Sequence, residues 1–333
     1  MKLSRQLFIA AAVAAALASA PATAQIKWDL AHVFGPTDQA GVAAEYFAKL
    51  VKEKTKGQIE VTVHHAGALG YKCLDHLNLV AEGGLVIASI CTSFHSGVHP
   101  IFSINTMPFL VQKPEDAKHF HASVQRVYDK VYRSYNQFEL YSSPNPPSGL
   151  WAKKPILSAA DLKNWKLRVY DVNGLKTFIR AGAAAIQLAW SDVVPALATS
   201  TIDGVLTGAD AGFSSGFPDY LNHFIYVNFA IPWGSTNINL DTWNELSPEL
   251  QKAVKEAGKE TKEMSWKRME TMLIEKNNKD MRAAGVTVIE DPPQAFLDFL
   301  QKAGKPALDE LLVKLGPDGP AMLDDYRRRI GQK

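Results

Sequence analysis

The stretch DLKNWKLRV at residues 161–169 decides the fold of this chain, because it ends in a short apolar strand that carries one arginine, Arg168. Two further pieces follow it, WSD at residues 190–192 and IDGVLT at residues 202–207. A guanidinium stays charged in proteins and presents paired N–H donors that match an anion. An arginine held on a strand near aromatic residues therefore indicates a site that binds an anion, not one that breaks bonds.

Strand and helix patterns alternate around this stretch. We expect strands at residues 166–170, 185–188 and 204–206, and helices at 173–181 and 191–199. Parallel strands need a crossover between them, and a helix is the usual crossover. This half of the chain is therefore predicted to form a parallel, doubly wound α/β unit.

The N-terminal part repeats the same rhythm. We expect strands at residues 26–32, 59–63 and 85–90, one helix capped by Thr37, and another at about 71–82. The run LVIASI at 85–90 is wholly apolar, which is typical of a strand covered on both faces. The mature chain has roughly 309 residues, which is more than a single hydrophobic core usually supports. The two units therefore predict two α/β lobes with a cleft between them.

The chain beyond Thr236 is largely helical. Ser247 and Pro248 form a strong helix start, with serine as the N-cap and proline at the first helical position. No proline follows before about residue 284, so we expect a helix of ~54 Å at 1.5 Å per residue, running along both lobes. The expected division is 25–144 plus about 232–265 for lobe I, and 145–231 plus about 266–333 for lobe II.

Residues 1–24 have the pattern of a secretory signal peptide. Two basic residues precede an apolar run at 7–18, and ATA at 22–24 fits a cleavage site. The alternative, a membrane anchor, is disfavoured because the run is shorter than the ~20 residues that span a bilayer. We expect a mature chain that begins at Gln25 and lies free in the periplasm.

Charge excludes one class of partner. Removal of the leader takes Lys2 and Arg5 from the 36 basic residues and none of the 34 acidic ones, which leaves a net charge near zero. A nucleic-acid-binding protein would show a basic patch or stripe. We therefore expect no nucleic-acid partner and no stable membrane insertion, and we expect a monomer.

The ends of the predicted strands supply the first site candidates. Ligands of open parallel sheets bind beyond the carboxyl ends of the strands. That rule selects Cys91, Thr92 and Phe94 in the first lobe, and Arg168, Trp190 and Thr207 in the second.

Five further residues are candidates for the site. His95 follows Phe94, and one of the two is expected to face the cleft. Trp151 and Trp233 line the pocket or pack in the core, since tryptophan buries a large area in either role. Asn237 lies on a predicted strand and is expected to contact the ligand near the hinge. Asp210 would repel a carboxylate unless the ligand carries a donor group for it.

Cys73 and Cys91 are the two cysteines of the chain. An oxidising compartment permits a disulfide between them, but the sequence does not fix the distance between their Cα atoms, so the disulfide stays open at this point. The spacing does not fit a zinc site. His119 and His121, at i and i+2 of a predicted helix, do not face the same way. We expect no metal and no cofactor.

The order of several short motifs resembles a known family. They are GALG at 67–70, MPFL at 107–110 with EDA at 115–117, KKPI at 153–156 with DLK at 161–163, Arg168, WSDV at 190–193 and DG at 203–204. Across essentially the whole mature chain, this pattern resembles the periplasmic substrate-binding proteins of TRAP transporters, the DctP family. The resemblance implies a two-lobed fold of the periplasmic-binding-protein type with a long helix bridging both lobes. It also implies delivery of an organic acid to a membrane permease of small and large subunits, driven by an ion gradient, and a salt bridge between Arg168 and the ligand's carboxylate.

The chain departs from the family pattern at three places. Many relatives carry a second arginine before the KPI motif, but PPSGL at 146–150 has none. Relatives that bind acidic sugars often have an asparagine where Thr207 stands, and Cys91 replaces a residue that is often polar. We therefore expect a monocarboxylate ligand, with an apolar or aromatic body.

Two rival functions remain at this stage. A secreted hydrolase or lyase would need Cys91 as nucleophile with His95 or His99 as base, and the chain has neither a G-x-S-x-G elbow nor an HExxH motif. A ligand-sensing partner of a membrane kinase would have the same fold and site as a transport receptor.

Overall fold

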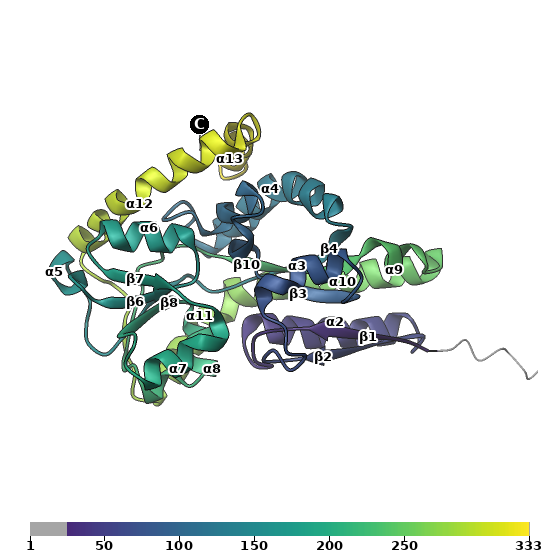
Figure 1. The fold of residues 1–333 in the computed structure, drawn as a ribbon, viewed down its shortest axis with the longest axis horizontal. Coiled ribbons are helices and arrows are strands. Elements are labelled where there is room, and N and C mark those ends of the chain that lie inside the picture. The colour runs from purple at the N-terminus through teal and green to yellow at the C-terminus, as the bar shows by residue number, and fades with distance from the viewer. Residues whose placement is uncertain (1–24, 333) are drawn as a thin grey trace, which may run out of the picture.

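The computed structural model describes residues 25–332, and the expected signal peptide lies outside this range. The chain folds into two lobes, each built around its own β-sheet, and a long helix runs past both (Figure 1). The predicted α/β class and the two-lobed architecture are confirmed.

The sheet of the first lobe has five strands in the order β2-β1-β3-β10-β4. They are β1 (Ile26–Ala31), β2 (Ile59–His64), β3 (Ile87–Ile90), β4 (Gln137–Pro144) and β10 (Trp233–Asn239). The three early strands are parallel, as predicted. Strand β10 runs antiparallel to both of its neighbours, so the sheet is mixed.

The sheet of the second lobe has six strands in the order β11-β9-β5-β8-β6-β7. They are β5 (Gly149–Ala152), β6 (Lys166–Val169), β7 (Ala184–Gln187), β8 (Gly204–Thr207), β9 (His223–Ile225) and β11 (Thr287–Ile289). The predicted strands β6, β7 and β8 are mutually parallel. Strand β5 is antiparallel to both β8 and β9.

Helices and 3₁₀ turns connect the strands of each sheet. In the first lobe they are α2 (Gln39–Lys54), α3 (Cys73–Ala81), α4 (Pro114–Ser134) and α9 (Leu240–Asn244), with the 3₁₀ turns η1 (Thr92–His95) and η2 (Pro100–Thr106). In the second they are α5 (Ala159–Leu162), α6 (Val172–Arg180), α7 (Val193–Ala198) and α8 (Ala209–Ser214), with η3 (Trp190–Asp192) and η4 (Phe217–Asp219). The cap of α2 is Asp38, not Thr37 as predicted, because its carboxylate accepts the N–H of Gly41 at 2.7 Å.

The predicted long helix is present and contains one irregular turn. It consists of α10 (Pro248–Arg268), a π-helical turn (Met269–Leu273) and α11 (Ile274–Ala283). Ser247 caps it as predicted. Helix α10 packs on α2 and β4 of the first lobe, whereas α11 packs on α8 and β11 of the second. The π turn therefore lies where the helix passes from one lobe to the other.

The C-terminal helices differ from the expected division of the chain. Helix α12 (Gln294–Leu315) begins against the second lobe, where Phe296 and Leu300 join its core. Its far end packs on η2 of the first lobe, α13 (Asp318–Arg329) packs on α4, and apolar residues such as Leu311 and Tyr326 join the core there. The sequence predicts these last residues in the second lobe, because their order along the chain does not reveal that α12 crosses back to the first.

Two extended segments cross between the lobes side by side. They lie between β4 and β5 and between β9 and β10. Asn145 N–H donates to the carbonyl of Pro232, and Ser148 N–H donates to that of Ala230, each at 2.8 Å. This pairing fixes the two crossings to each other and places the candidate site beside them.

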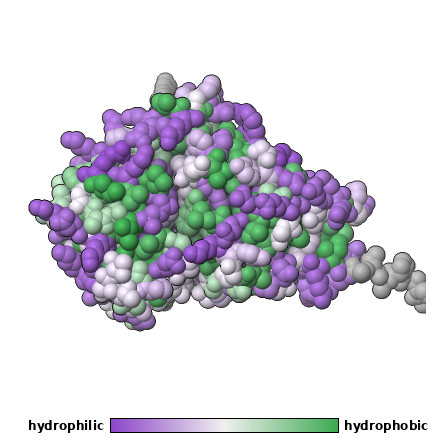
Figure 2. All heavy atoms as spheres, viewed as in Figure 1, coloured by the Kyte–Doolittle hydropathy of each residue, from purple (hydrophilic) through white to green (hydrophobic). Residues whose placement is uncertain are grey.

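The outer surface is mixed in character. On the face in Figure 2, hydrophilic residues fill most of the outline, and apolar residues gather in small patches nearer the middle. Within residues 25–332, none of the helices has the length and apolar character required to span a bilayer.

Candidate ligand-binding site

A cavity of about 100 Å³ lies between the two sheets. Both lobes and both crossing segments contribute to its wall. The lining residues are Phe34, Asp38, Ala40, Ser89 to Phe94, Tyr141, Ser143, Asn145, Ser148, Arg168, Tyr170, Trp190, Thr207, Gly208, Asp210, Ala211 and Pro232 to Thr236. The volume is well below the ~300–1,000 Å³ of sites for drug-sized ligands, so it suits a small solute.

Arg168 is the cation of this cavity wall and is 1 % exposed. It lies on β6, and its Nε and Nη2 donate to the carbonyl of Leu188 at 3.1 and 2.9 Å. Burial lowers the pKa of Arg168 to about 10, so the side chain stays charged at neutral pH. Within residues 25–332 no carboxylate forms a salt bridge with it. The backbone thus fixes two of its five N–H groups and orients the rest.

Aromatic rings form one side of the cavity beside this guanidinium. The ring of Trp190 lies 5.5 Å from the Arg168 Cζ, within the range of a cation–π interaction. Phe34 from the first lobe meets Trp190 edge-on at 5.6 Å between ring centroids. The contact joins the lobes and leaves an apolar surface for the body of a ligand.

The first-lobe wall comes from the end of β3 and the 3₁₀ turn η1. Cys91, Thr92 and Phe94 line the cavity, as the position of the strand end predicts. His95 does not line it. In a 3₁₀ turn successive side chains diverge, and the His95 ring is turned inward, 5.8 Å from that of Phe102.

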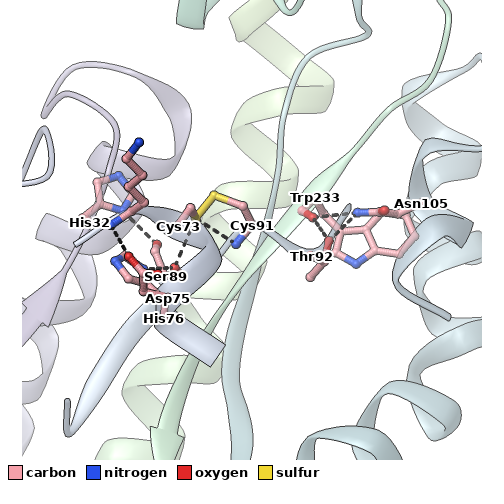
Figure 3. The surroundings of a disulfide bond; sticks show 10 residues. His32, Cys73, Asp75, His76, Ser89, Cys91, Thr92, Asn105 and Trp233 are labelled. Atoms are coloured by element: carbon pink, nitrogen blue, oxygen red, sulfur yellow. Dashed lines mark hydrogen bonds between the residues drawn. A yellow bond between two sulfur atoms is a disulfide. The ribbon is translucent and has the colours of Figure 1, made fainter. Parts of the chain in front are cut away.

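Cys73 and Cys91 form a disulfide, with their Cα atoms 5.9 Å apart (Figure 3). The bond ties the start of α3 to the end of β3. Buried polar groups surround it, since Ser89 binds the rings of His32 and His76 through its hydroxyl and carbonyl, at 2.8 and 2.7 Å. The cavity wall at Cys91 is thereby anchored.

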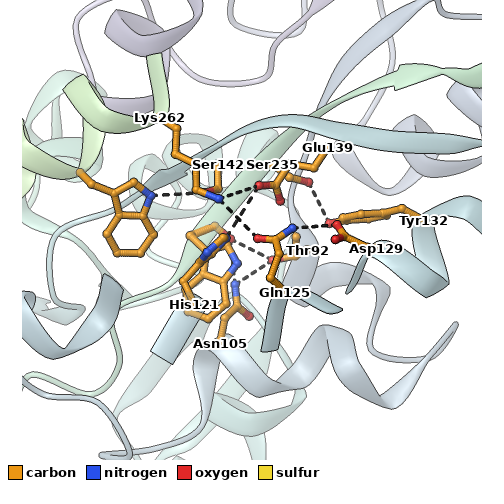
Figure 4. Close-up of polar contacts among 12 residues, drawn as sticks. Thr92, Asn105, His121, Gln125, Asp129, Tyr132, Glu139, Ser142, Ser235 and Lys262 are labelled. Atoms are coloured by element: carbon orange, nitrogen blue, oxygen red, sulfur yellow. Dashed lines mark hydrogen bonds and ion pairs between the residues drawn. The ribbon is translucent and has the colours of Figure 1, made fainter. Parts of the chain in front are cut away.

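A polar network supports the same wall from behind (Figure 4). Asn105 donates to the Thr92 hydroxyl at 2.7 Å and to the carbonyl of Trp233 at 2.8 Å. The Tyr132 hydroxyl lies 2.8 Å from that of Ser235. Deeper in this network, the buried Glu139 meets Lys262 at 3.4 Å. These contacts hold Thr92 and Ser235 in place at the cavity.

Two acidic side chains also reach the cavity, Asp38 from the start of α2 and Asp210 from α8. Asp210 Oδ2 accepts the backbone N–H of Gln39 at 3.1 Å, a contact between the lobes. Burial, followed by repulsion from Asp210, raises the pKa of Asp38 to about 7. Burial also raises the pKa of Asp210.

Eight of the eleven predicted site residues line the cavity, and three do not. The eight are Arg168, Trp190, Thr207, Asp210, Cys91, Thr92, Phe94 and Trp233. Trp151 is fully buried between Phe217 and Phe224. It lies on β5, whose antiparallel direction carries its end away from the cavity.

Asn237 also lies outside the cavity. It is fully buried, and its amide donates to Gln137 Oε1 at 3.0 Å. Strand β10 is antiparallel to β3, so the start of β10 lies at the cavity edge and a residue farther along does not. The expected hinge-side contact from Asn237 is therefore not supported by the geometry.

Several lining residues were missed. Phe34 and Asp38 follow the carboxyl end of β1, so the same strand-end rule would have found them. Tyr170 immediately follows β6 and was within reach of that rule as well. Asn145 and Pro232 come from the crossing segments, whose pairing has no sequence pattern.

Two α/β lobes, joined by paired crossings and a long helix, enclose a small cavity with a buried arginine. These features define a solute receptor of the periplasmic-binding-protein class. A family model described as "Bacterial extracellular solute-binding protein, family 7" (DctP) matches residues 30–314, so the chain belongs to this family. It is a solute receptor of the TRAP type, as the resemblance implied.

Two curated relatives illustrate the range of the family. The chain is 26 % identical over 301 residues to the 2,3-diketo-L-gulonate-binding periplasmic protein of Escherichia coli, covering 86 % of this chain and 87 % of that one. It is 25 % identical over 238 residues to a monocarboxylate 2-oxoacid-binding periplasmic protein of Nostoc, covering 70 % and 65 %.

Solved structures agree with the fold. An extracytoplasmic solute receptor of Bordetella pertussis that binds pyroglutamic acid is 25 % identical, with a TM-score of 0.86 over 91 % of this chain and 99 % of that one. A marine metagenome TRAP solute-binding protein specific for pyroglutamate is 26 % identical, with the same score and coverage.

Proposed function

We propose that this protein is a periplasmic receptor that binds a small organic acid and delivers it to the membrane subunits of a TRAP transporter. The observation that carries the proposal is the guanidinium of Arg168, which is buried in the wall of an interlobe cavity and lacks an ion pair among residues 25–332. A buried charge without a salt bridge is costly, even though the carboxyl of Asp171 attracts this guanidinium. A ligand carboxylate would remove that cost and match the paired N–H donors.

The wall favours a monocarboxylate with a compact apolar body. Arg168 is the one arginine among the lining residues, so a second carboxylate would lack an equivalent partner. Phe34, Phe94 and Trp190 offer apolar surface instead. A relative described as binding monocarboxylate 2-oxoacids and a solved receptor that binds pyroglutamic acid are examples of monocarboxylate ligands among similar proteins.

Binding is proposed to close the lobes. The bodies that move would be residues 25–144 with about 232–265, and 145–231 with about 266–303. The C-terminal residues from about 304 would travel with the first, since their apolar side chains pack there. Contacts made only in the closed state favour it when ligand is present.

The geometry gives no support to the enzyme alternative. Cys91 is held in the disulfide, so it cannot act as a thiolate nucleophile. Burial lowers the pKa of His95 to about 4, and its ring points away from the cavity. A kinase-sensing partner would use the same site. Uptake that requires the membrane subunits would favour the transport function.

A ligand screen tests the proposal. The mature protein is heated with members of an organic-acid library, and a ligand that binds only the folded state raises its Tm. Calorimetry then compares wild type with Arg168→Ala. Loss of binding in the variant is expected, whereas unchanged affinity would reject Arg168 as the carboxylate partner.

A further inference from the structure

An acceptor in the cavity wall has no donor. Asp210 is 7 % exposed, lines the cavity, and uses Oδ2 to accept the N–H of Gln39. Its other oxygen, Oδ1, is buried and lacks a hydrogen bond of good geometry among the described residues, although the backbone N–H groups of Asp210 and Ala211 lie near this carboxylate and act to lower its pKa. A buried acceptor without a donor costs free energy that a suitable donor would recover.

The nearby arginine does not fill this position. Arg268 points its guanidinium at the side-chain oxygen of Gln39. No salt bridge joins Arg268 to Asp210 or Asp38 in the part of the chain that the structure describes. Asp38 adds a second carboxyl group to the same region of the cavity. The acidic wall therefore still has a vacant acceptor, although a cation lies near it.

We propose that Asp210 Oδ1 accepts an N–H group of the ligand, so that the ligand class is a small carboxylate that carries a nitrogen donor, either an amine or an amide. The inference rests on the proposed function, because Arg168 binds the carboxylate of the same molecule. We favour a nitrogen donor over a hydroxyl. An ammonium or amide N–H donates without also presenting a lone pair to the two carboxyl groups, whereas a hydroxyl oxygen is itself an acceptor. Dicarboxylates and plain 2-oxoacids are disfavoured, since each would place an acceptor against an acceptor.

The same carboxylate links recognition to closure. Oδ2 of Asp210, in the second lobe, binds the start of α2 in the first lobe, while Oδ1 is available to the ligand. A ligand N–H bound to Oδ1 would fix the orientation of the whole Asp210 carboxylate, including Oδ2. Ligand recognition and the interlobe contact therefore depend on the same side chain.

Asp210→Asn separates these two roles. An asparagine retains one oxygen for the Gln39 N–H, and replaces the other by an NH₂ donor. The interlobe contact can persist, but the ligand's N–H would now face a donor. Asp219→Asn, an exposed position in the same lobe, is the matched control.

Five ring carboxylates of nearly equal size serve as probes in calorimetry with the mature protein. Proline and pyroglutamate carry a ring N–H, tetrahydrofuran-2-carboxylate carries a ring oxygen, cyclopentanecarboxylate carries neither, and 1-hydroxycyclopentanecarboxylate carries a hydroxyl. Wild type is expected to bind at least one N–H probe tenfold or more tightly than the three others. Asp210→Asn should lose that preference, and Asp219→Asn should keep it.

Several outcomes would overturn the inference. They are equal binding of the N–H probes and cyclopentanecarboxylate, a preference for the hydroxyl probe, no binding of either N–H probe, or an unchanged preference in Asp210→Asn. If the donor-free acids bind wild type and lose affinity in Arg168→Ala, the proposed function stands and this inference alone fails. If Arg168→Ala binds every acid as wild type does, the proposed function fails first.

Discussion

At the scale of single residues, Arg168 is expected to depend on its geometry as well as on its charge. Lysine at this position would keep the charge but lose the planar set of N–H donors, some of which bind the carbonyl of Leu188 while others are available to the ligand. Hydrogen bonds to charged groups contribute roughly 1.5–3 kcal/mol, so Arg168→Lys should weaken binding about tenfold or more. Calorimetry measures this, and Arg180→Lys on the exposed face of α6 should change nothing. Equal affinity in Arg168→Lys would show that a point charge suffices.

Asp38 makes stability depend on pH. Its pKa is raised from 3.8 to about 7, so the folded state holds a proton that the unfolded state has lost. This contribution is fully present below pH 3.8 and disappears as the pH rises through about 7. Asp38→Asn removes the titration and keeps the helix cap, because both residues cap equally well. Between pH 4.5 and 7.5, the free energy of unfolding of the variant should rise relative to that of wild type by about 3 kcal/mol.

Urea unfolding at the two pH values measures that difference, without ligand. Asp309→Asn, at an exposed position in α12, is the control and should follow wild type at both. A difference between Asp38→Asn and wild type that does not change with pH would contradict the raised pKa.

Site residues were predictable where they lie at the carboxyl ends of parallel strands. Arg168, Thr207 and Cys91 were found because they end or follow parallel strands. Trp151 packs in the core, one of the two roles left open for it, because its strand runs antiparallel, and strand direction cannot be read from an apolar pattern. One of Phe94 and His95 is expected to face the cleft, and Phe94 does; which of the two it is depends on the backbone conformation of the 3₁₀ turn, which the sequence pattern does not reveal.

At the scale of elements, the disulfide should stabilise the first lobe. It closes a loop with a sequence separation of 18 residues, for which chain entropy predicts about 3 kcal/mol. Cys73→Ser with Cys91→Ser should therefore lower the free energy of unfolding by about that amount. Urea unfolding measures it, and reduced wild type should match the double variant. A loss well below 1 kcal/mol would indicate that α3 and β3 hold their positions without the bond.

Local patterns predicted the regular elements but not how the chain crosses between lobes. The helix that begins at Pro248 was predictable from its N-cap and from the absence of a later proline up to about residue 284. The π turn at Met269–Leu273 has no recognisable sequence pattern. Strands β5 and β10 follow the crossings, and their antiparallel direction depends on contacts distant in sequence. The return of α12 to the first lobe depends on the same kind of contact.

At the scale of the whole molecule, the structure has the lobes in contact away from the cavity. Asn173, on α6 of the second lobe, donates to the carbonyl of Ser103 at 2.8 Å and to the Thr106 hydroxyl at 3.0 Å, both on η2 of the first. Thr106 in turn donates to Asp171. Because Asn173 does not line the cavity, its contribution to binding would act through closure alone.

Asn173→Ala is therefore expected to weaken binding without touching the ligand. Two hydrogen bonds at roughly 0.5–1.5 kcal/mol each should reduce the closed population and raise the apparent Kd on the order of tenfold. Small-angle scattering should find the unliganded variant at least as open as wild type. With saturating ligand both should reach the same compact form. Asn244→Ala, an exposed change at the end of α9, is the control. Unchanged affinity in Asn173→Ala would mean that this contact persists when the lobes open, so that the hinge lies on its other side.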